Sequence, residues 1–204
     1  MKKQISKYLS NLMEQKGNPS SLELFKEEKD YVEKNELLEV LSSESITIVE
    51  KEAAFRFSDA YIERSDKESE ELISEEEEAF LNQPIHYLKE HMNEFIYLES
   101  SWFELIGVDA VSFEVDDVFR TYDVMLGLKQ QKKLEARIKE FLKYELNGDE
   151  AKFDLMFNPE DGLWNLNFDL NSVEGFTEDM KFGEAFQIIY ALLFKLVETL
   201  EEAK

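Results

Sequence analysis

The stretch that decides the fold is residues 153–170, FDLMFNPEDGLWNLNFDL. Apolar and polar residues alternate on both sides of its centre, the pattern of strands with one buried face. Residues 158–162 (NPEDG) join the two sides, and Asn, Pro and a closing Gly are residue types that form turns. The stretch therefore predicts a β-hairpin, the clearest one in the chain.

The residues on either side extend this into an α+β pattern. Residues 111–115 (VSFEV) alternate in the same way, and residues 119–126 are a candidate hairpin partner. Apolar residues recur at helical spacing over 128–146. The segment 186–197 is apolar on nearly every side, so a helix there is buried either in the core or by a second subunit.

In the first half of the chain, apolar residues recur mainly at the spacing of helices. It predicts helices near residues 5–13, 20–41 and 82–96, with two short strands around a turn within 46–57. We therefore expect an α+β fold with a helical N-terminal half followed by a small antiparallel sheet packed by two amphipathic helices. The expected regions are 1–105 and 106–204, either as two domains or as one continuous domain.

Charge restricts the partners. The chain has 46 Asp and Glu against 23 Lys and Arg, a formal net charge of −23. Nucleic acids and anionic membrane surfaces repel such a polyanion, whereas a basic protein is attracted to it. The absence of cysteine excludes disulfides and thiolate metal sites.

Hydropathy predicts a cytoplasmic protein. The longest apolar run, residues 188–194, is far shorter than the roughly 20 residues of a membrane span. Residues 1–11 lack the apolar stretch of a signal peptide.

Acidic clusters are the candidate partner-binding residues. The first cluster is Glu68, Glu70, Glu71, Glu75, Glu76, Glu77 and Glu78, and the second is Glu114, Asp116 and Asp117. They predict a non-catalytic cytosolic interaction protein that binds a basic partner. Immunity proteins and antitoxins that neutralise basic nucleases are the model, because charge complementarity speeds association.

Two alternatives stay open. Carboxylate or metal chemistry at Glu114, Asp116 and Asp117 would make the chain a small enzyme. A homodimer through the C-terminal helix would make it structural. His86 and His91, five positions apart, do not form a metal pair on a straight helix.

The residues predict no cofactor, because the seven glycines form no phosphate-binding loop. The polar residues Asn165, Asn167, Asp169 and Asn171 lie on one side of the returning strand, as a solvent face or as a polar binding surface.

Three stretches carry a family resemblance: residues 53–64 (AAFRFSDAYIER), 97–110 (YLESSWFELIGVDA) and 161–168 (DGLWNLNF). Together they resemble an uncharacterised family of small acidic proteins from low-GC Gram-positive bacteria. Its members sometimes carry a branched-chain aminotransferase label. A pyridoxal-phosphate enzyme needs a marked Schiff-base lysine and a phosphate cup, and no lysine here has such a context.

Overall fold

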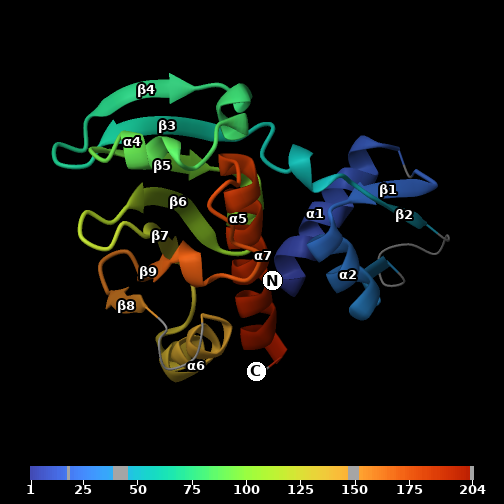
Figure 1. Cartoon of the computed structure of the whole chain (residues 1–204). Coiled ribbons are helices and arrows are strands. Elements are labelled where there is room, and N and C mark those ends of the chain that lie inside the picture. The colour runs from blue at the N-terminus through green and yellow to red at the C-terminus, as the bar shows by residue number, and fades with distance from the viewer. Residues whose placement is uncertain (18, 39–45, 147–151, 203–204) are drawn as a thin grey trace. The chain divides into compact units, whose positions relative to one another are not determined.

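The computed structural model describes residues 1–17, 19–38, 46–146 and 152–202 (Figure 1). The chain divides into two compact units, unit 1 (Met1–Arg56) and unit 2 (Phe57–Lys204). The large antiparallel sheet and the longest helix both belong to unit 2.

Unit 1 combines helices with a small parallel sheet. Its elements are α1 (Lys2–Gln15), β1 (Ser21–Leu24), α2 (Lys26–Lys34), β2 (Thr47–Glu50) and a 3₁₀ turn (Ala53–Phe55). The helix predicted near residues 5–13 is confirmed, and Ile5, Leu9 and Met13 are its buried stripe. β1 pairs with β2 in parallel, Ser21 opposite Thr47.

The hairpin predicted within residues 46–57 is wrong, because β2 pairs with β1 and residues 53–55 form the 3₁₀ turn. Arg56 then makes ion pairs at 2.8 Å with Glu28 and at 2.5 Å with Glu27, both in the first turn of α2. The helix predicted over 20–41 is also wrong in its first part, where β1 lies. Its part beyond residue 38 falls outside the described residues.

Unit 2 is built on a seven-stranded antiparallel sheet of order β4-β3-β5-β6-β7-β9-β8. Its strands are β3 (Tyr61–Asp66), β4 (Leu72–Glu76), β5 (Glu94–Glu99), β6 (Val108–Val115), β7 (Tyr122–Leu128), β8 (Phe153–Asn158) and β9 (Leu163–Asp169). The predicted hairpin is confirmed as β8 and β9. Gly162 closes its turn at φ +70°, a conformation that favours glycine.

The helices of unit 2 lie between and after the strands. They are α4 (Tyr87–Glu90), α5 (Ser101–Leu105), α6 (Glu135–Glu145) and α7 (Phe182–Glu202), with 3₁₀ turns at Glu78–Asn82, Lys132–Leu134 and Leu170–Ser172. Figure 1 shows α7 running across the direction of the strands. No helix in the described part of the chain has the length and apolarity needed to cross a membrane.

One face of the sheet, called the closed face here, is buried. β7 alternates strictly between buried and half-exposed residues, so its buried side chains share that face. Phe113 of β6 packs there against Phe182 and Phe186 of α7, with ring centroids 5.9 and 6.2 Å apart. The apolar C-terminal helix therefore packs on the sheet of its own unit.

The predicted fold class is corrected in one respect. The protein is α+β, but the expectation of a helical N-terminal half with a small sheet is wrong, because β3, β4 and β5 precede residue 106. β5 pairs with β6, so one large sheet continues through the boundary expected near residue 105. Residues 61–66 and 94–99 form β3 and β5 although both faces of these strands contain charged residues, among them the buried Glu94.

The helix predicted over residues 82–96 shows why strands in the first half of the chain were not predicted. Ile85, Leu88 and Phe95 fit a helical stripe, yet α4 ends at Glu90 and β5 begins at Glu94. Residues 94–99 (EFIYLE) also alternate, and their pairing with β3 and β6 satisfies backbone groups on both sides. Tertiary pairing therefore overrides the helical spacing.

Candidate functional site

The second face of the sheet, called the open face here, faces away from the closed face. Register places Glu63, Tyr97, Ser112, Met125, Asn167 and Asp154 in one row across six strands. These side chains are half-exposed or exposed. Alternate residues of a strand share a face. The residues two positions before and after each member of this row therefore belong to the same surface.

Carboxylates recur over the whole open face. They come from all seven strands and are Glu63, Glu75, Glu99, Asp109, Glu114, Asp123, Asp154 and Asp169. No open-face position of these described strands holds a lysine or an arginine. The open face is therefore a surface whose charged strand residues are all acidic.

Two lysines lie at one end of this face. Lys67, in the β3–β4 turn, is 3.2 Å from Glu114 and 3.3 Å from Asp117. It also donates a hydrogen bond to the carbonyl oxygen of Val115 at 2.8 Å. Lys152 precedes β8 and lines a small pocket together with Asp123 and Asp169. The negative charge at this end is partly neutralised.

The carboxylates at this end interact strongly. Burial is the main cause that raises the pKa of Asp123 to about 6, and the charges of Asp116, Asp169 and Glu114 add to it, while Lys67 opposes it. Burial also raises the pKa of Asp169. The charge of Asp123 therefore changes in mildly acidic solution.

Tyrosines and glutamates alternate on β3 and β5. Tyr61 lies opposite Glu99, and Glu63 lies opposite Tyr97. The hydroxyl of Tyr61 donates to Glu63 at 2.6 Å, the hydroxyl of Tyr97 donates to Glu99, and the two rings meet edge to face at 6.5 Å. The hydrogen bond to Glu63 is the largest cause that raises the pKa of Tyr61 to about 12.

A pocket of about 440 Å³ lies in the middle of the open face, lined by residues of β5, β6, β7, β8 and β9. At its edge the β6–β7 pairing shifts register between Val108 and Val111. Asp109 lies in that bulge, and its Oδ1 accepts the backbone N–H groups of Ala110 at 2.7 Å and Gly127 at 2.8 Å. The bulge and the two donors fix the position of this carboxylate.

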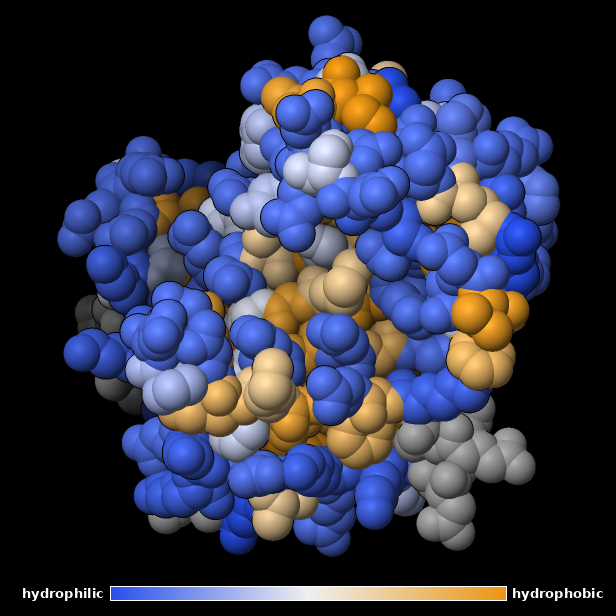
Figure 2. All heavy atoms as spheres, turned by 90° about the vertical axis from the view of Figure 1, so that its left-hand side faces the viewer, coloured by the Kyte–Doolittle hydropathy of each residue, from blue (hydrophilic) through white to orange (hydrophobic). Residues whose placement is uncertain are grey.

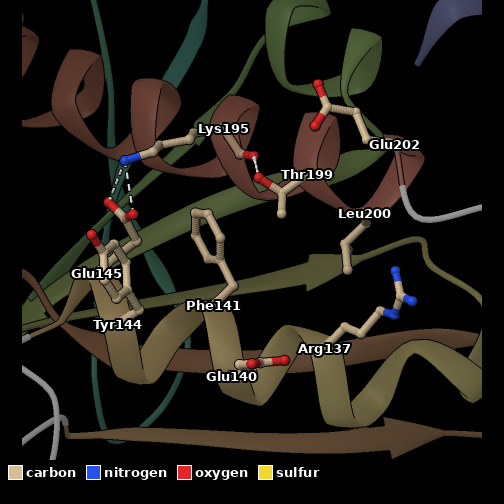
Figure 3. A pocket seen from close by; sticks show the side chains of 9 residues that line it. All are labelled: Arg137, Glu140, Phe141, Tyr144, Glu145, Lys195, Thr199, Leu200 and Glu202. Atoms are coloured by element: carbon tan, nitrogen blue, oxygen red, sulfur yellow. Dashed lines mark hydrogen bonds and ion pairs between the residues drawn. The ribbon is translucent and has the colours of Figure 1, made fainter.

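A larger pocket of about 610 Å³ lies between α6 and α7 (Figure 3). Phe141 and Leu200 line it together with side chains of both charges. Glu145 and Lys195 form an ion pair across it at 2.7 Å, and Thr199 donates to the carbonyl oxygen of Lys195 at 2.8 Å. The ion pair joins α6 to α7, and the mixed charge selects no class of ligand.

The first predicted acidic cluster does not form one surface. Glu68, Glu70 and Glu71 lie in the exposed β3–β4 turn, which the Asp66 carboxylate closes by accepting the N–H groups of Glu68 and Ser69. Glu75 is on the open face opposite Glu63, whereas Glu76 is paired with Arg64 at 2.6 Å. Glu77 and Glu78 lie at the start of the following 3₁₀ turn.

The second predicted cluster is also divided. Glu114 is on the open face and Asp117 is exposed, and Lys67 binds both. Asp116 accepts the N–H groups of Val118 and Phe119, and these bonds lower its pKa. Within the described residues no group of three or more His, Asp or Glu side chains is arranged to hold a metal ion.

The polar side of β9 also divides. Asn165 and Asn167 are exposed and line the 440 Å³ pocket. Asp169 is buried and accepts the N–H of Asn171, whose side-chain oxygen accepts the N–H of Tyr122. Asn165 and Asn167 are therefore the exposed part of this side of β9, and Asp169 is a buried carboxylate at its end.

Tyr97, Glu99, Asp109 and Gly127 were not identified from the sequence. Gly127 interrupts a run of larger residues in β7, which is a signal of a close approach by another group. The approaching group, Asp109, is eighteen positions away in the chain, and strand pairing brings it to Gly127.

Figure 2 shows one side of the molecule, where the surface is mostly hydrophilic and hydrophobic residues gather in a few places.

Comparison with protein-family models, curated proteins and solved structures found no match to this chain.

Proposed function

We propose that this chain is a non-catalytic protein-interaction protein and that the open face of its seven-stranded sheet binds a basic protein. The observation that carries the proposal is the set of carboxylates that recur over this face, with no lysine or arginine at its described strand positions. Fixed charge of one sign on a continuous surface attracts a partner of the other sign and orients it.

The size of the face supports a protein partner. Seven strands about 4.8 Å apart, each about six residues long, span roughly 29 by 20 Å. A typical interface buries about 800 Å² on each partner, which is the same order. Inhibition of a basic nuclease, as immunity proteins do, is one function that such a surface serves.

Aromatic residues add binding capacity beyond charge. Tyr61 is 41 % exposed, and Tyr97 is half-exposed beside it. Tyrosine is enriched at interface hot spots, and its ring attracts a cation placed over its face. The β3–β4 turn has exposed carboxylates without such rings.

The test uses a fluorescent peptide of repeated Lys-Gly-Arg-Gly units and measures anisotropy at about 0.1 M and about 0.5 M salt, which differ about twofold in screening length. The test variant is Glu63→Gln with Glu75→Gln on the open face. The matched control is Glu68→Gln with Glu71→Gln in the β3–β4 turn, because it removes the same charge.

We expect the affinity to fall with salt, and to fall about three- to tenfold more in the open-face variant than in the turn variant at low salt. Equal losses in both variants, or an affinity independent of salt, would overturn the proposed function.

A further inference from the structure

The pocket of about 440 Å³ differs from the rest of the open face because one of its carboxylates is held in place by the backbone. An ideal Cβ on Gly127 would lie 2.3 Å from Oδ2 and 2.8 Å from Oδ1 of Asp109. The carboxylate therefore occupies the space that any other residue at position 127 would fill.

Only one oxygen of this carboxylate is used within the protein. Oδ1 of Asp109 accepts two backbone N–H groups, whereas no described group donates a hydrogen bond to Oδ2. Since a carboxylate has about four acceptor positions, acceptor capacity remains on Oδ2 of this pocket-lining residue. A preorganised acceptor loses little conformational entropy when a ligand binds it.

The other walls of the pocket suit a flat, partly apolar cation. Tyr97 and Glu99 contribute an aromatic ring and a second carboxylate from β5, and Met125 contributes a polarisable apolar side chain. Asn165, opposite Gly127 in the register, adds an amide. No lining residue is a lysine or an arginine, so the protein supplies no counter-charge of its own there.

A guanidinium group matches this combination better than other cations. It is planar, it carries five N–H donors that reach two carboxylates at once, and it stacks on aromatic rings. An ammonium group is a compact, strongly hydrated charge that gains less from a ring and a methionine wall. The described residues contain no set of ligands for a metal ion.

We propose that this pocket binds the guanidinium group of an arginine side chain of the basic partner, with Asp109 and Glu99 as acceptors and Tyr97 as the stacking surface. The inference rests on the proposed function and names the chemical group that the open face recognises.

The experiment is an NMR titration of the full ¹⁵N-labelled chain with N-acetyl-arginine amide. The Gly127 amide is the reporter, because its N–H donates to Asp109. The citrulline analogue, which has nearly the same shape without the charge, and the lysine analogue are titrated in parallel. We expect a saturable shift of the Gly127 and Ala110 amides, and at least about tenfold weaker binding of the citrulline and lysine analogues.

Two variants test the pocket, and a third variant is the control. Asp109→Asn keeps the shape and removes the charge, while Gly127→Ala keeps the charge and displaces the carboxylate. Each is expected to weaken arginine binding about tenfold. Glu71→Gln, in the β3–β4 turn, removes the same charge as Asp109→Asn and is expected to change binding less than about twofold.

Three results would overturn the inference: a Gly127 amide that does not shift, citrulline or lysine that binds as well as arginine, or equal effects of Asp109→Asn and Glu71→Gln. Glu63 and Glu75, used to test the proposed function, are outside the pocket lining. Basic-peptide binding that depends on them would therefore stand even if the arginine pocket failed.

Discussion

The two faces of the seven-stranded sheet use alternate residues of the same strands for different purposes. Phe113 on β6 is buried against α7, while Ser112, the residue before it, lies beside Tyr97 and Met125 on the open face. The closed face stabilises the fold and the open face presents the charge. Substitutions of neighbouring residues should therefore separate stability from binding.

The largest effect is expected on the closed face. Phe113→Ala removes a ring that packs on Phe182, Phe186 and Tyr122, and should lower the free energy of unfolding by about 3–5 kcal/mol. Ser112→Ala should change it by less than about 0.5 kcal/mol. Urea unfolding measures both. Similar losses for the two variants would contradict the division between the faces.

The next effect is at the bulge of the open face. Gly127→Ala should lower the free energy of unfolding by about 1–2 kcal/mol, because the Asp109 carboxylate must leave its two backbone donors. The same substitution in an Asp109→Ala background should cost less, since no carboxylate is displaced. A double-mutant cycle measures the difference, and strict additivity would show that the two residues are not coupled.

A smaller, pH-dependent effect is expected at Asp123. Its pKa is raised to about 6 in the folded protein, so the folded state binds the proton more tightly than the unfolded state. The stability that protonated Asp123 contributes is therefore lost as pH rises from about 4 through about 6. Asp123→Asn should therefore raise the free energy of unfolding at pH 8 by about 1 kcal/mol, allowing for solvent screening, and by almost nothing near pH 4. A gain that does not depend on pH would contradict this cause.

The smallest effect, with the opposite sign, is expected at Asp116. Backbone hydrogen bonds from Phe119 and Val118 lower its pKa, so its contribution to stability is present above the ordinary aspartate pKa and is lost as pH falls. Asp116→Asn should destabilise the protein slightly at pH 7 and not at low pH. Thermal unfolding of the Asp116 and Asp123 variants across the same pH range compares the two directly.

The elements that were predicted from sequence have local signals. Residues 153–170 contain both strands of a hairpin and its turn, so β8 and β9 follow from alternation and turn residues alone. The apolar helix near the C-terminus is confirmed, and central burial was one of its two expected explanations.

The elements that were missed depend on distant residues. β4 is an edge strand with its side chains exposed or half-exposed, so it lacks a buried alternating pattern. β3 and β5 bury few apolar residues among many charged ones, and their pairing with one another and with β6 decides their structure. The prediction of a helical first half failed for this reason.

The candidate site shows the same limit. Acidic composition predicted a basic partner, and the polar side of residues 165–167 was recognised as a surface that the structure places on the open face. The Asp109–Gly127 contact was not predictable, because it requires the register of β6 against β7 and a bulge between Val108 and Val111. Composition described the charge but not its location.

The central claim is that the open face, rather than the acidic β3–β4 turn, binds the basic partner. The most direct measurement is an NMR titration of the ¹⁵N-labelled chain with the Lys-Gly-Arg-Gly peptide at about 0.1 M salt. The account predicts that the largest amide shifts fall on Tyr97, Ser112, Met125 and Asn167, which form one row across the sheet. Largest shifts in residues 68–71, with the row unchanged, would contradict it.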